Sequence, residues 1–268
     1  MPQATGTILD EIVARKRIDL ADDRARTSLA SVRARAEAAA PARDFAGALR
    51  TCGISLIAEI KRASPSAGDL RGDLTPIDLA QTYADNGAAA CSVLTDTPYF
   101  RGELADLVEV RQAVDSPLLR KDFTIAPYQV YEARASGADA VLLIVAILDD
   151  TELADLQTLA HELGMAALVE THNRAELGRA LRVTPPLLGI NNRDLHTFEV
   201  DLGTTERLRN EVPDGVVLVA ESGILTPDDV IRLAKIGVDA MLVGTALVRA
   251  SDTGAAVRRL VEAGRRTG

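Results

Sequence analysis

Short apolar runs rich in Leu, Val, Ile and Ala recur from residue 54 onward, and their starts lie 21 to 35 residues apart. This spacing leaves room for a strand, a loop and a crossover helix, whereas a hairpin needs only a short turn. Near-continuous apolarity is typical of parallel strands that are covered on both faces. We therefore expect eight strands, at 54–61, 89–95, 117–123, 140–146, 166–172, 187–194, 216–222 and 240–247.

The joints between these runs repeat as well. A Thr-Pro pair with an acidic residue close behind marks two helix starts, and a glycine precedes several runs where a helix should end in a left-handed cap. The starts are Thr75-Pro76 and Thr226-Pro227, and the glycines are Gly87, Gly137, Gly164 and Gly237. Eight βα units of this kind close as a barrel. The predicted fold class is therefore α/β, a (β/α)8 TIM barrel.

The first 50 residues do not follow the repeat. Apolar residues recur at helical spacing, with Glu11, Arg15, Lys16 and Asp19 between them. These apolar residues are Ile8, Leu9, Ile12 and Val13, with Ile18 as a further candidate. A second helix is expected around 31–39, before Pro41. We predict an N-terminal helical extension at 1–50 and a barrel at 51–268, together one domain. Packing of the extension on the outside or end of the barrel is favoured over a lid.

Composition narrows the function classes. The chain has 268 residues, 47% of them hydrophobic, a net charge of −9 and a pI near 5.0. An acidic chain opposes general binding to nucleic acid, and no apolar run approaches the roughly 18 residues of a membrane span. Cys52, Cys91 and the three histidines lack the spacing of a metal site. We expect a cytoplasmic protein with metal-free chemistry, either a monomer or a weak homo-oligomer.

Polar residues fall where the predicted strands end. Alternate residues of a barrel strand point inward, and active sites lie at the C-terminal strand ends. Five of the predicted strands are apolar along their length and carry polar or charged residues at the C-terminal end. These residues occupy inward-facing positions, where a rim that is merely exposed to solvent would not require charged side chains. The polar or charged residues are Glu59, Lys61, Lys121, Glu170, His172, Asn191, Arg193 and Glu221. Phe123 shares the inward face of the third strand, whereas Asn192 faces outward. Buried charges are costly unless they are paired, so the cluster indicates catalysis.

Two loops predict an anion site. Ser222 and Gly223 follow the seventh strand, and Gly244 and Thr245 follow the eighth. In this fold the corresponding loops commonly bind phosphate through backbone N–H groups and a helix N-terminus. One such glycine alone indicates only a turn, but the two loops together favour a phosphate ligand. Lys61, Lys121 and Arg193 would hold an anionic substrate locally within an acidic chain.

Five motifs resemble one known family in order along the chain, from about residue 7 to near residue 260. They are Ala58-Glu59-Ile60-Lys61-Arg62-Ala63-Ser64-Pro65-Ser66, Leu94-Thr95 with Tyr99-Phe100-Arg101-Gly102, Leu119-Arg120-Lys121-Asp122-Phe123, Gly189-Ile190-Asn191-Asn192-Arg193-Asp194-Leu195 and Ala220-Glu221-Ser222-Gly223-Ile224. The chain is similar to indole-3-glycerol-phosphate synthases. The resemblance implies conversion of 1-(2-carboxyphenylamino)-1-deoxyribulose 5-phosphate to indole-3-glycerol phosphate, with loss of carbon dioxide and water, in tryptophan biosynthesis. It implies no metal or organic cofactor.

The resemblance also implies roles for residues. Lys121 would be the general acid, and Glu170, Lys61 and Glu59 would serve the later loss of hydroxyl and proton, although Lys61 could equally hold a substrate anion. Substrate hydroxyls would be oriented by Glu221 and Asn191. The carboxylate side would contact Arg193, Ser64, Pro65 and Ser66. The ring pocket would be lined by Phe100, Phe123, Leu142, Leu195 and Leu242, of which the three leucines could each be plain core. The phosphate would rest on Ser222, Gly223, Gly244 and Thr245, where the family often has Ser or Glu in place of Thr245.

Other functions stay open at this point. A second phosphate-binding barrel, phosphoribosylanthranilate isomerase, pairs a Cys base with an Asp acid, but Cys52 precedes the first strand and Cys91 lies early in the second. A class I aldolase needs a lysine that is desolvated enough to form a Schiff base, and Lys61 or Lys121 could serve. A non-catalytic barrel that binds a sugar phosphate is a third alternative, which the two lysines and three acids oppose.

Overall fold

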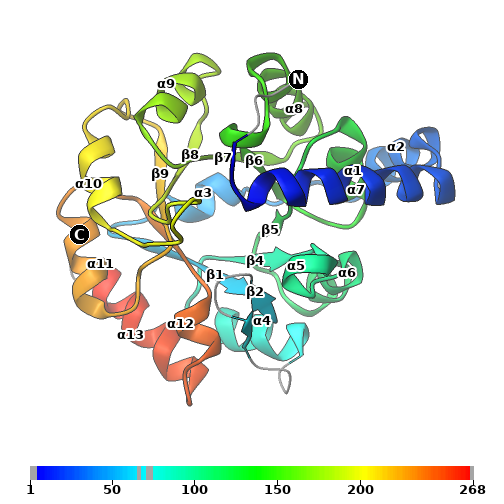
Figure 1. Ribbon diagram of the computed structural model, residues 1–268. Helices are drawn as coiled ribbons and strands as arrows, with labels where there is room; N and C mark the ends of the chain where they lie inside the picture. The colour runs from blue at the N-terminus through cyan, green and yellow to red at the C-terminus, as the bar shows by residue number, and fades with distance from the viewer. Residues whose placement is uncertain (1–4, 65–67, 71–74, 266–268) are drawn as a thin grey trace.

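The computed structural model describes residues 5–64, 68–70 and 75–265. Its centre is a closed barrel of eight parallel strands in the order β1-β10-β9-β8-β7-β6-β5-β4, with β4 paired to β1 (Figure 1). The strands are β1 Ser55–Ile60, β4 Ala90–Leu94, β5 Leu118–Lys121, β6 Ala140–Ile144, β7 Ala166–Thr171, β8 Leu187–Asn191, β9 Val217–Glu221 and β10 Ala240–Val243. Each lies inside a range predicted from the apolar runs, and the predicted fold class is confirmed.

The predicted strands extend too far at their C-terminal ends, by up to four residues in the last one, where 240–247 was expected and β10 ends at Val243. Lys61, Phe123, His172 and Arg193 consequently lie in loops just beyond strands. Period-two alternation continues for a residue or two past the last ladder hydrogen bond, so the pattern alone does not mark where a strand ends.

Helices between successive strands surround the barrel (Figure 1). They are α4 Pro76–Asp85, α6 Leu104–Ala113, α7 Pro127–Ala135, α8 Asp150–Glu162, α9 Arg174–Arg182, α10 Gly203–Arg209, α11 Pro227–Ala234 and α13 Thr253–Arg265. Smaller elements follow strand ends, namely β2 Ala63–Ser64, β3 Gly68–Asp69, α5 Thr97–Phe100, η1 Val145–Ile147 and α12 Thr245–Val248. Within the described ranges, no helix is both long and apolar enough to span a bilayer.

The predicted caps are confirmed. Thr75 and Thr226 accept hydrogen bonds at the N-termini of α4 and α11, each with proline in the first turn. The four glycines expected to end helices have φ between 74° and 95°, a region that other residues adopt at a cost. All residues of β1, β4, β6, β9 and β10 are buried. Apolar side chains on both faces of these strands fill the barrel and its contacts with the helices, as a parallel sheet requires.

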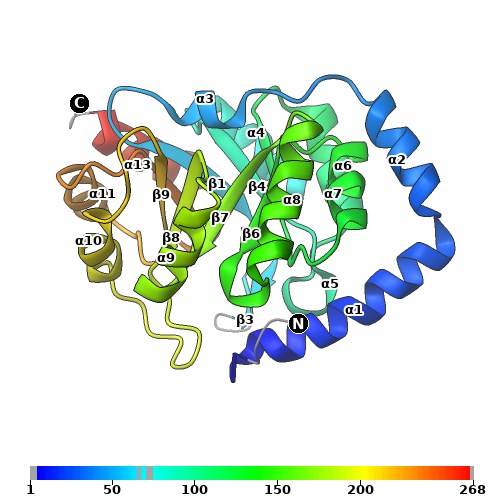
Figure 2. The ribbon, with the colours of Figure 1, turned by 90° about the horizontal axis from the view of Figure 1, so that it is seen from above.

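Three helices precede β1, namely α1 Ile8–Arg26, α2 Leu29–Ala38 and α3 Phe45–Leu49. Figure 2 shows α1 running along one end of the barrel, α2 beside α7, and α3 at the opposite end. Val32 of α2 packs in a small cluster with Tyr128 of α7, and the Arg33 guanidinium lies 5.8 Å from the centroid of the Tyr131 ring. The second predicted helix is therefore present, with slightly different bounds.

The buried face of α1 differs in two positions from the one expected. Leu9, Ile12 and Val13 are buried in the same hydrophobic core as the barrel, but Ile18 is 57% exposed. Lys16, which we expected among the polar residues between apolar ones, is only 7% exposed. A helical face that covers a polar strand end accepts a charged residue when partners of opposite charge meet it there.

Candidate active site

A cavity of about 530 Å³ opens at the C-terminal ends of the barrel strands. It is lined by every described residue that sequence analysis assigned to the site. These are Glu59, Lys61, Ser64, Phe100, Lys121, Phe123, Leu142, Glu170, Asn191, Arg193, Leu195, Glu221, Ser222, Gly223, Leu242, Gly244 and Thr245. Pro65 and Ser66 lie outside the described residues. The structure thus brings these side chains together, while their individual roles stay predictions.

Lys121, the last residue of β5, lies between two carboxylates. Its Nζ is 3.2 Å from Glu170 Oε2 on β7 and 3.7 Å from Glu221 Oε2 at the end of β9. All three side chains are almost fully shielded from solvent. Burial alone would lower the pKa of Lys121, but the charges of Glu170, Glu221 and Glu59 outweigh it and raise the pKa above its usual value. Lys121 is therefore an ammonium at neutral pH.

The two carboxyl groups beside Lys121 differ in protonation. Burial favours the neutral form of both, but Lys121 and His172 lower the pKa of Glu170 well below its usual range. Burial and the nearby charge of Glu170 raise the pKa of Glu221 well above its usual value. Two carboxyl groups this close to each other and to one ammonium do not both ionise easily. Glu170 is accordingly available to accept a proton, and Glu221 to donate a hydrogen bond.

A second charged pair lies at the end of β1. Lys61 Nζ is 2.5 Å from Glu59 Oε1, and both side chains are largely buried. The Glu59 carboxylate packs directly against the backbone at the end of β10, since a Cβ added at Gly244 would lie 2.4 Å from Glu59 Oε1. The absence of a side chain at Gly244 therefore gives Glu59 its position next to Lys61.

The loop after β9 has an unusual backbone. Ser222 has a φ of 66°, in the left-handed region that non-glycine residues rarely occupy, and Gly223 follows with a φ of 83°. Asn192 holds this loop, because its Nδ2 donates to the carbonyls of Glu221 and Ser222 at 3.0 and 3.2 Å. Thr205 donates from its N–H and its hydroxyl to Asn192 Oδ1. Asn192 points away from the barrel axis as predicted, but it is buried and positions the predicted phosphate loop, which face alternation could not reveal.

One side of the cavity is apolar. The rings of Phe100 and Phe123 have centroids 6.0 Å apart and are tilted by 41°. Leu142 and Leu242 are buried core residues that also line the cavity, and their contact with a substrate ring stays a prediction. Helix α1 adds Ile8, Leu9 and Ile12 to the lining. Helical periodicity identified this apolar face of α1 but not the surface that it covers.

Arg193 places a guanidinium at the cavity rim. It follows β8, pairs through its backbone with Val200 in an isolated bridge, and donates from Nη1 to the Phe198 carbonyl at 3.1 Å. Burial lowers the pKa of Arg193 from its usual value, and the charge of Glu59 opposes this. An arginine remains cationic after such a shift, so Arg193 offers a planar donor for a carboxylate.

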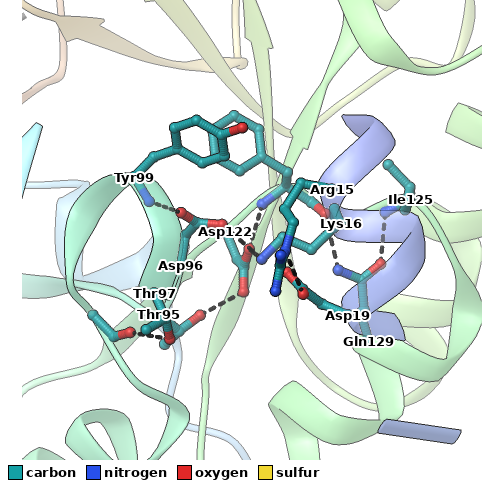
Figure 3. Close-up of polar contacts among 12 residues, drawn as sticks. Arg15, Lys16, Asp19, Thr95, Asp96, Thr97, Tyr99, Asp122, Ile125 and Gln129 are labelled. Atoms are coloured by element: carbon teal, nitrogen blue, oxygen red, sulfur yellow. Dashed lines mark hydrogen bonds and ion pairs between the residues drawn. The ribbon is translucent and has the colours of Figure 1, made fainter. Parts of the chain in front are cut away.

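A buried charge network fastens α1 to the strand ends beside Lys121. Lys16 Nζ lies 2.8 Å from Asp96 Oδ2 and 2.8 Å from Asp122 Oδ1 (Figure 3). Asp122 also accepts hydrogen bonds from Thr95 Oγ1 at 2.7 Å and Arg120 Nη2 at 3.1 Å. Burial would raise the pKa of Asp122, but Arg120 and Lys16 lower it to about 2. Sequence analysis missed this network, because the partners of Lys16 come from loops after β4 and β5.

The arrangement supplies one buried ammonium, one ionised and one neutral carboxyl group, an apolar slot for a flat ring, and glycine loops at the opposite side. Within the described part of the chain, no group of three or more His, Cys, Asp or Glu side chains is placed to hold a metal ion. An ammonium beside a carboxylate in a partly apolar cavity is an arrangement suited to proton transfer with an anionic substrate that carries a ring.

Comparisons with known proteins agree with this arrangement. The family model described as indole-3-glycerol phosphate synthase matches residues 9–260. A curated indole-3-glycerol phosphate synthase of Laribacter hongkongensis is 52% identical over 258 residues, covering 94% of this chain and 98% of that protein. One of Roseiflexus sp. (strain RS-1) is 53% identical over 263 residues, covering 95% and 98%.

Solved structures with little sequence similarity share the barrel fold. KGPDC from Streptococcus mutans has a TM-score of 0.63 at 10% identity, over 80% of this chain and 99% of its own. The 3-hexulose-6-phosphate synthase from Salmonella typhimurium also has a TM-score of 0.63, at 14% identity, over 80% of this chain and 100% of its own. These two likenesses show the fold alone, whereas the family model and the curated relatives decide the family. The chain belongs to the indole-3-glycerol phosphate synthase family.

Proposed function

We propose that this chain closes the indole ring of indole-3-glycerol phosphate from 1-(2-carboxyphenylamino)-1-deoxy-D-ribulose 5-phosphate, with loss of carbon dioxide and water, as a carboxy-lyase of tryptophan biosynthesis. One observation carries the proposal. The Lys121 ammonium lies between Glu170 and Glu221 in a cavity that also has an apolar slot and a glycine loop. Family membership supports the same reaction.

The first stage forms the carbon–carbon bond. The ring carbon that bears the carboxylate attacks the ketone carbon, and the carbonyl oxygen becomes an alkoxide. Lys121 stabilises this oxygen and gives it a proton, because an alkoxide is a stronger base than a lysine amine. Loss of carbon dioxide then returns the bonding electrons to the ring. Phe100, Phe123 and Leu142 would hold the ring flat against this reaction centre.

The second stage removes water. The carbinol loses its hydroxyl group, which leaves with a proton, and the neighbouring carbon loses a hydrogen to form the indole double bond. Glu170 is the proton acceptor in the proposal, because its lowered pKa keeps it ionised and its Oε2 lies beside Lys121, the proposed donor of the first stage. The Lys61 and Glu59 pair would assist departure of the hydroxyl group.

Substrate contacts account for the remaining lining residues. The phosphate would lie on the N–H groups of the loops at Ser222, Gly223, Gly244 and Thr245, in the manner common to this fold. Glu221 and Asn191 would hold the sugar hydroxyls, and Arg193 with Ser64 the substrate carboxylate. Leu195 and Leu242 would complete the ring pocket together with the side chains of α1.

The other functions considered from sequence are less well supported. Neither cysteine lines the cavity, and burial raises the pKa of Cys91 to about 12, which opposes a thiolate base. Schiff-base chemistry needs a lysine amine that is easily deprotonated, whereas carboxylates raise the pKa of Lys121 and Lys61 is paired with Glu59. Cytoplasmic location, absence of nucleic acid binding, and a monomeric or weakly oligomeric state stay predictions.

The test is direct. The purified chain is mixed with the carboxyphenylamino-deoxyribulose phosphate, and formation of the indole chromophore is followed by ultraviolet absorbance. We expect the product with the wild-type chain and not with Lys121→Met, and mass spectrometry should identify indole-3-glycerol phosphate. Absence of this product from the folded wild-type chain would contradict the proposal.

A further inference from the structure

His172 connects two carboxylates at the end of β7. Its ring Nδ1 lies 3.0 Å from Glu176 Oε2, and its Nε2 lies 3.3 Å from Glu170 Oε1. The imidazole side chain is 6% exposed. The same Glu170 offers its other oxygen, Oε2, to Lys121 at 3.2 Å. The two oxygens of Glu170 thus face two different nitrogen groups.

Hydrogen bonds other than the one to the His172 ring fix the position of Glu176. It occupies the third position of α9, where its backbone N–H donates to the capping Asn173 side chain at 3.0 Å. Asn173 Nδ2 donates to Glu176 Oε1 at 2.7 Å, and the backbone N–H of His172 donates to Glu176 Oε2 at 2.8 Å. The carboxylate accepts two of these hydrogen bonds, and it fixes the direction of the His172 ring by accepting the Nδ1 hydrogen as well.

This geometry favours an imidazolium. With a hydrogen on Nδ1, a neutral ring would place the lone pair of Nε2 close to the carboxylate of Glu170, whereas a charged ring places positive charge there. Nε2 is 3.3 Å from Glu170 Oε1 but has no hydrogen-bond partner among the described residues, so a protonated ring would stabilise Glu170 through charge rather than through an aligned hydrogen bond. Burial would lower the pKa of His172, but Glu170 and Glu176 raise it to about 10.

We propose that His172, oriented by Glu176, is a positioning residue that keeps Glu170 ionised and directed at the substrate while Lys121 is engaged with the substrate carbonyl. The inference rests on the proposed function, in which Lys121 turns from Glu170 to the ketone. Without a second cation, Glu170 would then be a buried carboxylate beside Glu221, and it would take a proton from solvent before it could accept one from substrate.

The neighbouring charges determine the sign of the expected pH effect. Glu170 lies on β7, just before His172, and Glu176 is on the following helix. His172 lines two cavities, and Arg193 is common to both. The other charged or titratable side chains are Arg174, Arg179, Asp194, His196, Glu199, Asp201 and Arg207 in one cavity, and Glu59, Lys61, Lys121, Asp122, Glu221 and Arg249 in the other. Among the carboxylates of the described residues, those of Glu170 and Glu176 alone lie within 4 Å of its ring nitrogens. Removal of the imidazolium therefore raises the pKa of Glu170.

Three variants test the proposal by steady-state kinetics across pH. We expect His172→Asn to move the acid limb of the kcat profile to higher pH by about one unit, with kcat about tenfold lower on that limb and nearly unchanged on the plateau. Glu176→Gln should give a smaller shift in the same direction. The double variant should match His172→Asn alone, because Glu176 acts through the ring. His161→Asn, at an exposed histidine of α8, is the matched control.

A uniform fall in kcat with an unshifted acid limb would indicate a merely structural role and overturn the proposal. A second measurement does not depend on turnover. Nitrogen-15 NMR of labelled histidine should show both His172 ring nitrogens protonated at pH 8 in the substrate-free protein, and Glu176→Gln should move deprotonation to lower pH. A neutral ring at pH 7 would also overturn the proposal. Failure of the wild-type chain to form indole product would contradict the proposed function, whatever the NMR result.

Discussion

Lys121 and Glu170 project from β5 and β7, strands separated by β6, yet Lys121 Nζ lies 3.2 Å from Glu170 Oε2. Inward side chains of alternate barrel strands share one layer, so these two side chains meet inside the barrel although their strands are not hydrogen-bonded to each other. The proposed proton donor and the proposed proton acceptor therefore form an ion pair with each other. A substrate that binds between Lys121 and Glu170 must separate the two side chains. Lys121 then loses its contact with Glu170 and contacts the substrate oxygen in its place.

Replacement of Lys121 tests the donor. We expect Lys121→Met to lower kcat by about 10²- to 10⁴-fold, because a positioned acid contributes on this order. The fold should persist, since Glu170 can take up a proton once its cation is lost. Lys235→Met, at an exposed lysine after α11, is the control for loss of a charge. A Lys121→Met variant with wild-type kcat and an unchanged circular dichroism spectrum would contradict the role.

Replacement of Glu170 separates the two stages. In the proposed sequence Glu170 acts after decarboxylation, so Glu170→Gln should release carbon dioxide in a single turnover but form indole at least about 10²-fold more slowly. The measurement combines trapping of carbon dioxide from a carboxyl-labelled substrate with ultraviolet absorbance. Glu162→Gln, at the exposed end of α8, is the control. Equal loss of both signals would place Glu170 in the first stage instead.

The fold could be predicted because independent sequence features, namely the apolar runs, the helix starts and the helix ends, all indicate the same architecture. Apolar runs at a βα spacing, Thr-Pro helix starts and left-handed glycines all indicate one barrel, and the rule that active sites lie at C-terminal strand ends then selected the site. The inward positions of Glu59, Lys121 and Glu170 follow from a period of two, which needs no tertiary information.

Features that depend on partners from different elements could not be predicted. Lys16 has the sequence context of a surface lysine, and only the loops after β4 and β5 show that two aspartates meet it. Asn192 was assigned to the correct face, but its hydrogen bonds to the next loop depend on how β8 and β9 pair. Periodicity specifies the direction of a side chain within its own element, whereas burial and charge pairing are set by the neighbours.

The Lys16 network predicts a role for α1 in stability. Lys16→Met would leave Asp96 and Asp122 buried without that cation, and breaking a buried pair in this way costs about 3–5 kcal/mol. We expect a loss near 3 kcal/mol in urea unfolding, because Asp122 keeps Arg120 and Thr95. The Michaelis constant should rise as well, since Ile8, Leu9 and Ile12 of the loosened helix line the cavity. Arg17→Met, at an exposed position on the same helix, should change neither quantity.

The same network predicts an acid-sensitive stability. The pKa of Asp122 is about 2 in the folded chain, below its ordinary value of 3.8, so its ionised form stabilises the fold. This contribution is complete above about pH 4 and is lost as pH falls toward about pH 2. Asp122→Asn should therefore lower the free energy of unfolding at pH 6. The difference in free energy of unfolding between the variant and the wild type should shrink as pH falls through this window. Urea unfolding at several pH values measures the difference, and a gap that is constant from pH 6 to pH 2.5 would contradict it.

Replacement of Gly244 should displace the Glu59 side chain by steric contact rather than through backbone strain. The Gly244 φ of −127° is accessible to alanine, but the added Cβ would lie 2.4 Å from Glu59 Oε1 and 3.0 Å from Glu59 Cβ. The Glu59 side chain must therefore rotate away and lose its 2.5 Å contact with Lys61. We expect Gly244→Ala to lower kcat/KM by about tenfold or more, since a catalytic group displaced by an ångström loses much of its effect.

Gly178→Ala is the matched control for Gly244→Ala. Gly178 lies within α9, an added Cβ meets nothing within 4 Å, and alanine in a helix should stabilise the chain by up to about 1 kcal/mol without a kinetic effect. If the pair at Glu59 and Lys61 serves the dehydration stage, Gly244→Ala should slow indole formation more than release of carbon dioxide in a single turnover. Equal rates for the Gly244→Ala and Gly178→Ala chains would show that the position of Glu59 does not matter to the reaction.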